Sequence, residues 1–314
     1  MSALKQPDID IETIKCDDQC IGSHLGTALD ENTDPSVVIV GYPSEEGARR
    51  LGAPLGASKG PDMLRRELYR MKPHPKHYAI FSKLLAHTKD LGNIDITGDM
   101  ESDQDALAQT IAPYLKKEIL VIIIGGNHET SYGHFKGYVE ANKEVSIFNF
   151  DAHPDVDPVK DNKNTAGTTF RQILEHPSGI CNTYTVAGLQ PSETVKAHLD
   201  YLRSKKARYF LKDAVNLSTF KYILDETSKT PMMFSLDMDV MDQISAPGVS
   251  WPTVDGVDID TVFKTAYRTA QHPLVTSFDL VELNPTRDIN NRTSKLAALI
   301  MWNFMKGLSL RLNL

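Results

Sequence analysis

The sequence predicts an α/β protein built on one parallel sheet with helices on both faces. Short apolar runs of strand length alternate with segments whose apolar residues recur at helical spacing. Parallel strands are joined by crossover segments that are usually helical, so this alternation is typical of a sheet covered on both sides. No repeat, low-complexity tract or linker divides the 314 residues. We therefore expect one domain over residues 1–314, in which residues 1–34 form a polar N-terminal arm.

The apolar runs and the helical segments follow one another along the chain. Strands are expected at residues 37–41, 120–124, 145–148, 183–186, 207–211, 232–236 and 275–280. Helices are expected at residues 61–69, 101–117, 132–142, 193–204, 220–227 and 259–269. Residues 41–60 form a long loop rich in glycine and proline, and a loop of this length in a compact domain is usually functional. Its arginines, Arg49 and Arg50, either clamp a substrate carboxylate or lie on the solvated surface.

Composition narrows the class of partner. The net charge is −7 and no basic block is present, which argues against nucleic acid and against an anionic membrane and favours a small-molecule substrate. The N-terminus lacks the apolar segment of a signal peptide and no run is long enough to span a membrane, so a cytoplasmic protein is expected. Three cysteines, Cys16, Cys20 and Cys181, make a poor disulfide framework and are expected to be free thiols.

Metal-type ligands follow directly on the strand predicted at residues 145–148. Asp151, His153 and Asp155 stand two residues apart, and in extended chain such residues share one face. Pro154 cannot donate to a sheet ladder, so the chain leaves the sheet at this point. In open parallel sheets, ligands bind beyond the carboxyl ends of the strands. The pattern therefore carries three polar side chains into a crevice.

Two further strands end in the same way. Asp237 and Asp239 follow the strand at 232–236, and His128 follows the strand at 120–124 after two glycines. Any single aspartate here could be a turn or cap residue, but four aspartates in one crevice repel one another unless cations lie among them. Oxygen-rich ligation with a few imidazoles suits Mn²⁺, and six ligands exceed what one tetrahedral zinc needs. Two ions about 3.5–4 Å apart would hold a water as hydroxide.

The motifs and their order resemble those of the ureohydrolase family, which includes arginase, agmatinase and formimidoylglutamase. The resemblance implies an arginase-like three-layer α/β/α sandwich with a mostly parallel sheet of about eight strands, two Mn²⁺ ions per subunit and a trimeric or hexameric homo-oligomer. It covers nearly the whole chain and is carried by Gly125-Gly126-Asn127-His128, Asp151-Ala152-His153-Pro154-Asp155, residues 235–242, Ala246-Pro247-Gly248 and residues 281–285.

The same resemblance implies a role for each site residue. One ion would be held by His128, Asp151, Asp155 and Asp237, and the other by Asp151, His153, Asp237 and Asp239. Asp155 would also pass a proton from the bridging water toward the leaving nitrogen. Glu282 would pair with the cationic amidine or guanidine of the substrate.

Within the family, the details resemble formimidoylglutamase. Residues 41–50 and 128–135 are similar to that branch, and Ala166-Gly167 stands where arginases and agmatinases carry a proton-shuttling histidine. The implied reaction is cleavage of N-formimino-L-glutamate to L-glutamate and formamide, with Arg49, Arg50 and Arg171 as candidates for the substrate carboxylates. The alternatives are another amidine or guanidine hydrolase, such as agmatinase, guanidinobutyrase or arginase, and a catalytically inactive, metal-stabilised regulatory protein. His134 matches no motif role and is expected to be a surface or packing histidine.

Overall fold

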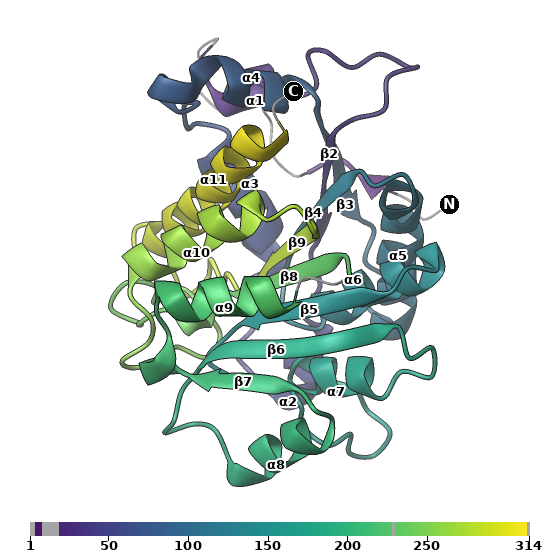
Figure 1. Ribbon diagram of the computed structural model, residues 1–314, viewed down its shortest axis with the longest axis vertical. Coiled ribbons are helices and arrows are strands. Elements are labelled where there is room, and N and C mark those ends of the chain that lie inside the picture. Colours follow the sequence, from purple (N-terminus) through teal and green to yellow (C-terminus); the bar gives the residue numbers. More distant parts are fainter. Residues whose placement is uncertain (1–3, 8–18, 228–229, 313–314) are drawn as a thin grey trace.

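A single nine-stranded sheet runs through the protein, which a computed structural model describes for residues 4–7, 19–227 and 230–312 (Figure 1). The strand order is β1-β3-β2-β4-β9-β8-β5-β6-β7. Only the two-residue β1 pairs antiparallel with its neighbour, and every other pair is parallel. The strands are β1 (Leu4–Lys5), β2 (Val37–Tyr42), β3 (Thr88–Ile94), β4 (Leu120–Gly125), β5 (Val145–Phe150), β6 (Cys181–Leu189), β7 (Arg208–Leu211), β8 (Met232–Asp237) and β9 (Val275–Val281).

Helices cover both faces of the sheet, so the molecule has three layers (Figure 1). One face packs against α1 (Ile21–His24), α3 (Gly60–Leu68), α4 (Tyr78–Ala86), α9 (Leu217–Thr227), α10 (Ile259–Gln271) and α11 (Arg292–Leu312). The other packs against α5 (Met100–Lys116), α6 (Thr130–Ala141), α7 (Thr169–Leu174) and α8 (Lys196–Ser204). The predicted α/β class with a mostly parallel sheet is confirmed.

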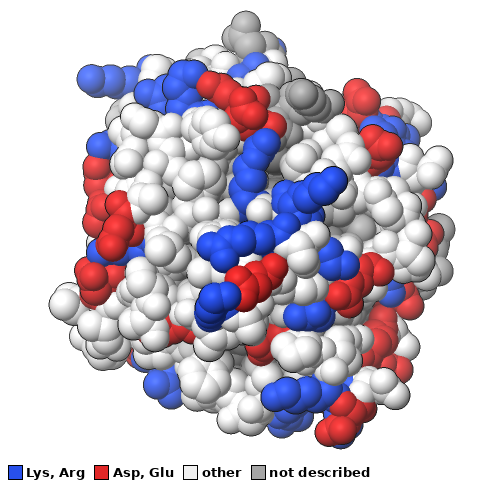
Figure 2. Space-filling view, turned by 60° about the horizontal axis from the view of Figure 1, so that its bottom comes forward, with Lys and Arg blue, Asp and Glu red and all other residues white. Residues whose placement is uncertain are grey.

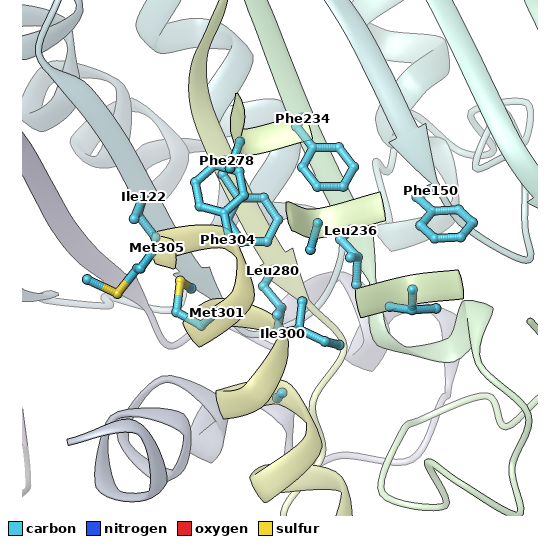
Figure 3. Packing of buried hydrophobic residues seen from close by; sticks show 14 of the residues in the cluster. Ile122, Phe150, Phe234, Leu236, Phe278, Leu280, Ile300, Met301, Phe304 and Met305 are labelled. Carbon is cyan, nitrogen blue, oxygen red and sulfur yellow. The ribbon is translucent and has the colours of Figure 1, made fainter. Parts of the chain in front are cut away.

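The central strands β8 and β9 present two different faces. Phe234 of β8 stacks on Phe278 of β9, with ring centroids 5.1 Å apart, and Phe278 stacks on Phe304 of α11 at 4.3 Å (Figure 3). All three rings are fully buried. Because side chains alternate along a strand, the residues next to these phenylalanines point to the opposite face, toward α6. Those neighbours are the polar residues Ser235 and Asp279.

Elements that the sequence did not predict complete the molecule. The strand β3 and the helices α4, α7 and α11 are additional to the predicted ones, and the loop at residues 41–60 contains the short helix α2 (Glu46–Leu51). The described part of the N-terminal arm joins the fold through several contacts: β1 pairs with β3, Ile21 is fully buried, and the N–H groups of Gly26 and Ala28 donate to carbonyl oxygens of Leu85 and Ala86. Cys16 lies outside the described residues.

Across the described ranges, no helix is both long and apolar enough to cross a membrane. The face shown in Figure 2 carries lysine and arginine side chains near its centre with acidic side chains beside them. That face does not present an uninterrupted basic surface of the kind that binds nucleic acid.

Candidate active site

Four neighbouring strands in the middle of the sheet, β4, β9, β8 and β5, deliver the predicted site residues at their carboxyl ends. His128 follows β4, Asp151 follows β5, and Asp237 is the last residue of β8. Glu282 follows β9 with a φ of 67°, and Asp155 has a φ of 46°. Left-handed backbone at residues other than glycine is strained and tends to occur at functional sites, where the surrounding structure holds it.

The first cluster of the site is formed by carboxylate oxygens around one ring nitrogen of His128. Its Nδ1 lies 3.2 Å from Asp151 Oδ2, 3.0 Å from Asp155 Oδ2 and 3.0 Å from Asp237 Oδ2. This nitrogen is buried and makes no hydrogen bond of acceptable geometry. Ligand atoms of His128, Asp151 and Asp237 lie within 4.8 Å of one another, which is the arrangement expected around a cation, and Asp155 adjoins this group through its contact with His128.

His153 forms the second cluster. Its Nδ1 lies 3.2 Å from Asp239 Oδ2 and 3.8 Å from Asp151 Oδ1. The other oxygen of Asp239, Oδ1, is buried without a hydrogen-bond partner. Asp151 contributes one carboxylate oxygen to each cluster, so the two groups of ligand atoms adjoin. The structure brings all six predicted metal ligands together.

Burial and mutual repulsion decide the protonation of these acids. Burial, reinforced by Asp239 and Asp151, raises the pKa of Asp237 well above its ordinary value. Burial also raises the pKa of Asp239, to about 6, although the imidazole of His153 opposes this shift. Burial and the charge of Asp151 raise the pKa of Asp155. The site therefore holds more negative charge than its imidazoles balance, and cations would favour the ionised carboxylates.

The same cluster of charges also shifts the pKa values of the histidine and of Asp151 in the site. Burial alone lowers the pKa of His128, but contacts with Asp151, Asp155 and Asp237 outweigh it and raise that pKa well above the ordinary value. The pKa of Asp151 is lowered, because the two histidines outweigh the effect of burial on that carboxyl. These imidazoles favour a positive charge at the positions where the acids gather.

Glu282 is buried next to the first cluster. Its Oε1 accepts a hydrogen bond from the backbone N–H of His128 at 2.8 Å, and its Oε2 accepts one from Asn127 Nδ2 at 2.7 Å. Burial and the charge of Asp237 raise the pKa of Glu282 well above its ordinary value. The carboxylate is thus fixed in one orientation beside the carboxylates of the cluster.

A cavity of about 340 Å³ opens onto these residues. None of the described residues that line it is a lysine or an arginine. Its inner wall is formed by Asn127, His153, Asp155, Asp237, Asp239 and Glu282, and the rest by Ala48, Leu51, Pro154, Asp157, Ala166, Gly167, Glu193, His198 and Trp251. A space of this size suits a small substrate.

Arg50, which we expected to bind a substrate carboxylate, is engaged with protein groups. Its two terminal nitrogens donate to the carboxylate of Glu101 at 2.7 and 2.9 Å, and Nη1 also donates to the carbonyl oxygen of Asn164 at 3.1 Å. The bidentate pair joins α2 to α5, and the contact with Asn164 holds the loop that leads to Ala166. In this structure the guanidinium stabilises one wall of the cavity.

The other two arginines differ in exposure. Arg171 donates from Nε to the carbonyl oxygens of Val156 and Asp157, and its guanidinium lies 3.8 Å from the centroid of the Tyr201 ring. Arg49 has a side chain that is 56% exposed, with ion pairs to acids of its own helical turn. Of the three, Arg49 keeps the greatest freedom to meet a ligand.

The sequence did not single out several residues of the cavity rim. His198, near the start of α8, lies with Nε2 3.0 Å from Asp157 Oδ1, and Glu193 lies 3.0 Å from Nε2 of His153. Neither residue stands at a strand end, which was the signal that identified the metal ligands. Gly167 is close to Asp157, because a Cβ on this glycine would lie 2.8 Å from Asp157 Oδ2.

Comparison with known proteins agrees with this arrangement. Residues 35–307 match the sequence model of the Arginase family. The formimidoylglutamase of Rhodococcus opacus (strain B4) is 34% identical over 289 residues, covering 87% of this chain and 86% of that protein. The formimidoylglutamase of Lysinibacillus sphaericus is 30% identical over 282 residues, covering 86% of this chain and 84% of that protein.

Solved structures give the same result. The crystal structure of Trypanosoma cruzi formiminoglutamase with Mn²⁺ superimposes with a TM-score of 0.85 at 26% identity, covering 94% of this chain and all of that chain. Formimidoylglutamase from Bacillus subtilis superimposes with a TM-score of 0.81 at 25% identity, covering 98% of this chain and 95% of that chain. From the family match and the extent of these similarities, we conclude that the chain belongs to the arginase family.

Proposed function

We propose that this protein is a manganese-dependent hydrolase that cleaves the amidine C–N bond of N-formimino-L-glutamate, giving L-glutamate and formamide. The observation that carries the proposal is the convergence of three carboxylate oxygens on the unpartnered Nδ1 of His128, next to a second cluster that shares Asp151. The activity named for the relatives, which match over most of both chains, supports the same reaction.

Two Mn²⁺ ions fit the donor set at the end of β5 and β8. We propose that His128, Asp151, Asp155 and Asp237 would hold one ion, and that Asp151, His153, Asp237 and Asp239 would hold the other. The buried atoms without partners, His128 Nδ1 and Asp239 Oδ1, are accounted for in this way. Bound metal would supply a water of lowered pKa as the nucleophile and would offset the charge of the carboxylates. The complete ligand set is His128, Asp151, His153, Asp155, Asp237 and Asp239.

The chain's own residues then orient the substrate and move protons. Asp155 lines the cavity beside the ligand cluster, so its carboxylate can take a proton and pass it to the leaving nitrogen. Glu282, held by two donated hydrogen bonds, pairs with the cationic amidine. Arg49 is our first candidate for a substrate carboxylate because Ala48 and Leu51 of the same helix line the cavity.

A substrate panel on the Mn²⁺-loaded protein tests the proposal. N-formimino-L-glutamate should exceed arginine and agmatine by orders of magnitude in kcat/KM, because the wall at Ala166 and Gly167 supplies no histidine to protonate a strongly basic leaving amine. Formamide, urea and ammonia should be measured separately, since they distinguish the reactions. Faster turnover of arginine or agmatine would contradict the substrate assignment and leave the metal site standing.

We also propose that residues 1–314 act as one domain, in the cytoplasm, as a homo-oligomer of three or six subunits. The unbroken sheet supports the single domain. The acidic composition supports a protein that has neither nucleic acid nor a membrane as a partner. Light scattering coupled to size-exclusion chromatography tests the subunit number. A monomer of 34.9 kDa would contradict that part of the proposal.

A further inference from the structure

A row of buried polar side chains runs from His128 away from the cavity, between the sheet and α6. Three of its members, Ser131, His134 and Tyr138, stand on one face of α6, since three- and four-residue steps return to the same side of a helix. Ser235 comes from β8 and Ser277 and Asp279 come from β9, on the face opposite to the stacked phenylalanines of Figure 3. Each of these side chains is at most 1% exposed: His128, Ser131, His134, Tyr138, Ser235, Ser277 and Asp279.

The near end of the row reaches His128 through a serine. His128 Nε2 lies 3.0 Å from Ser235 Oγ, and Ser235 Oγ lies 2.6 Å from Asp279 Oδ1. The same oxygen of Asp279 also accepts from Ser131 Oγ at 3.0 Å. Its other oxygen, Oδ2, lies 2.6 Å from Nδ1 of His134. Asp279 is therefore the centre on which one imidazole and two hydroxyls converge.

The far end of the row closes on His134. Its Nε2 lies 2.6 Å from Ser277 Oγ, which in turn lies 2.6 Å from the hydroxyl of Tyr138. That hydroxyl also contacts Thr276 Oγ1 at 2.6 Å. Both nitrogens of the buried His134 ring thus have partners, so the ring is held in one orientation. The residue that we expected to be a surface or packing histidine is part of a fully buried network.

The direction of these hydrogen bonds follows from the chemistry of Asp279. A carboxylate only accepts, so the hydroxyl of Ser235 must donate its proton to Asp279. The oxygen of Ser235 is then left to accept, and the groups that face it are Nε2 of His128 at 3.0 Å and the hydroxyl of Ser131 at 3.1 Å. His128 must therefore carry its proton on Nε2. In the neutral ring that binds a metal, the other nitrogen, Nδ1, then has its lone pair on the side of the three carboxylates.

We propose that His134 and Asp279, acting through Ser235, are positioning residues that fix the tautomer and ring orientation of His128 and thereby set the affinity of one of the two metal positions. The inference rests on the proposed function, since it takes His128 to be a metal ligand. Within the described part of the chain, the side chain of His153 has polar contacts with Asp151, Asp239 and Glu193, none of which belongs to this row. The effect should therefore fall on one ion.

Core packing alone does not account for the row. Burying so many polar groups costs free energy that apolar side chains at these positions would avoid, and the opposite face of the same strands is filled by phenylalanine and leucine. A polar row between two apolar cores indicates that its hydrogen bonds serve a neighbouring site. The neighbouring site in contact with it is His128.

Calorimetric titration of the metal-free protein with Mn²⁺ tests the inference through affinity at each position, without relying on turnover. Ser235→Ala removes one hydroxyl and leaves His128 without its acceptor. Loss of a group that orients a metal-bound histidine typically weakens binding by 10- to 100-fold. We therefore expect Ser235→Ala to weaken one of the two Mn²⁺ sites by about 10- to 100-fold and to leave the other within about twofold of the parent.

A matched pair at His134 separates positioning from packing. Asparagine can place its amide nitrogen near the position of ring Nδ1, whereas glutamine places it near that of Nε2. His134→Asn should therefore keep the donor to Asp279 and bind both ions nearly as the parent does. His134→Gln should weaken the same site as Ser235→Ala. Tyr138→Phe is the control, because it removes a buried hydroxyl of the row that touches neither Asp279 nor Ser235, and it should retain both affinities.

The outcomes are distinct, provided that thermal denaturation shows each metal-free variant to be folded. Parent-like affinity at both sites in Ser235→Ala overturns the inference, and so does an equal loss in Tyr138→Phe. Equal Mn²⁺ affinities in His134→Asn and His134→Gln would show that His134 is not one of the positioning residues. If either His134 variant fails to fold, Ser235→Ala decides the case. A parent that binds fewer than two ions contradicts the proposed metal centre instead.

Discussion

Replacing Glu282 by glutamine isolates the charge of the side chain that we place beside the substrate amidine. The carboxylate accepts from the N–H of His128 and from the amide of Asn127. A glutamine side chain has one acceptor oxygen and one donor nitrogen, so its nitrogen would face a group that also donates. Asn127 can relieve this by turning its amide over, because its Oδ1 is buried without a partner. The hydroxyl of Ser250, 3.4 Å from the same amide, can donate to the turned oxygen.

Glu282→Gln should therefore remove a negative charge without changing the fold around it. A hydrogen bond to a charged group contributes about 1.5–3 kcal/mol, which corresponds to roughly a 10- to 150-fold fall in kcat/KM for N-formimino-L-glutamate. The midpoint of thermal unfolding and the Mn²⁺ content should stay close to those of the parent. The control is Glu140→Gln, which removes one charge from an exposed position on α6 and should leave the kinetics unchanged.

Steady-state kinetics with formamide detection, together with metal analysis of the same preparation, decides between the readings. A kcat/KM within threefold of the parent would show that the charge of Glu282 does not stabilise the cationic amidine, either in the bound substrate or in the transition state. Loss of one Mn²⁺ equivalent would move Glu282 into the ligand set. Either result would refute the role that we assign to this residue.

Three further predictions concern the metal ligands, the arginines and pH. Asp237→Ala should lose both Mn²⁺ ions and Asp239→Ala mainly one, by elemental analysis; equal metal content would contradict the assignment of Asp237 to both ions. Arg49→Ala should raise KM by at least about tenfold with the metals retained, as expected for loss of a charged contact, whereas Arg50→Ala should lower the midpoint of thermal unfolding. The metal-free protein should lose thermal stability as the pH rises from about 4 to 7. Burial raises the pKa of Asp239 to about 6 and that of Glu129 to about 7 in the folded protein. Between the pKa of the unfolded chain and these values the folded protein binds more protons, so its free energy of unfolding falls as the pH rises. Mn²⁺ binds deprotonated ligands and should reverse this trend, so a metal-free protein that is more stable at pH 7 than at pH 4 would contradict the argument.

Two simple regularities led from the sequence to the candidate metal ligands. Side chains two residues apart share a face of an extended chain, and parallel strands present their carboxyl ends at the same edge. The second regularity accounts for the meeting of His128, Asp151 and Asp237, whereas the first does not describe residues 151–155, because the chain bends after β5 and Asp155 has a φ of 46°. No knowledge of distant contacts was needed.

The elements that were missed depend on such distant contacts. β3 carries Asp90 and Asn93, which are unusual in a strand, and both are partners of the fully buried Arg65 of α3. Strand propensity alone cannot identify a segment whose polar residues are satisfied by another element. The helix α11 did carry a local signal, since the carboxylate of Asp288 accepts from the backbone N–H groups of Thr293 and Ser294 at its start.

The arginines show the same limit at the level of a single side chain. Their chemistry suits a carboxylate, but the sequence does not say which carboxylate. Glu101, the partner of Arg50, lies 51 residues away on another helix. A charged side chain in a predicted functional loop is therefore a candidate whose partner only the fold identifies.

Charge balance connects the ligand set to the rest of the cavity. Four aspartates and two divalent ions carry equal and opposite charge, so the buried carboxylate of Glu282 remains as the acid that can meet the positive amidine at the inner end. The substrate also brings two carboxylates, and the described lining offers no lysine or arginine to meet them. We therefore propose that they are met at the rim, where Arg49 is half-exposed on the helix that lines the cavity through Ala48 and Leu51. On this reasoning, the inner site determines which bond is cleaved and the rim determines which amidine is accepted.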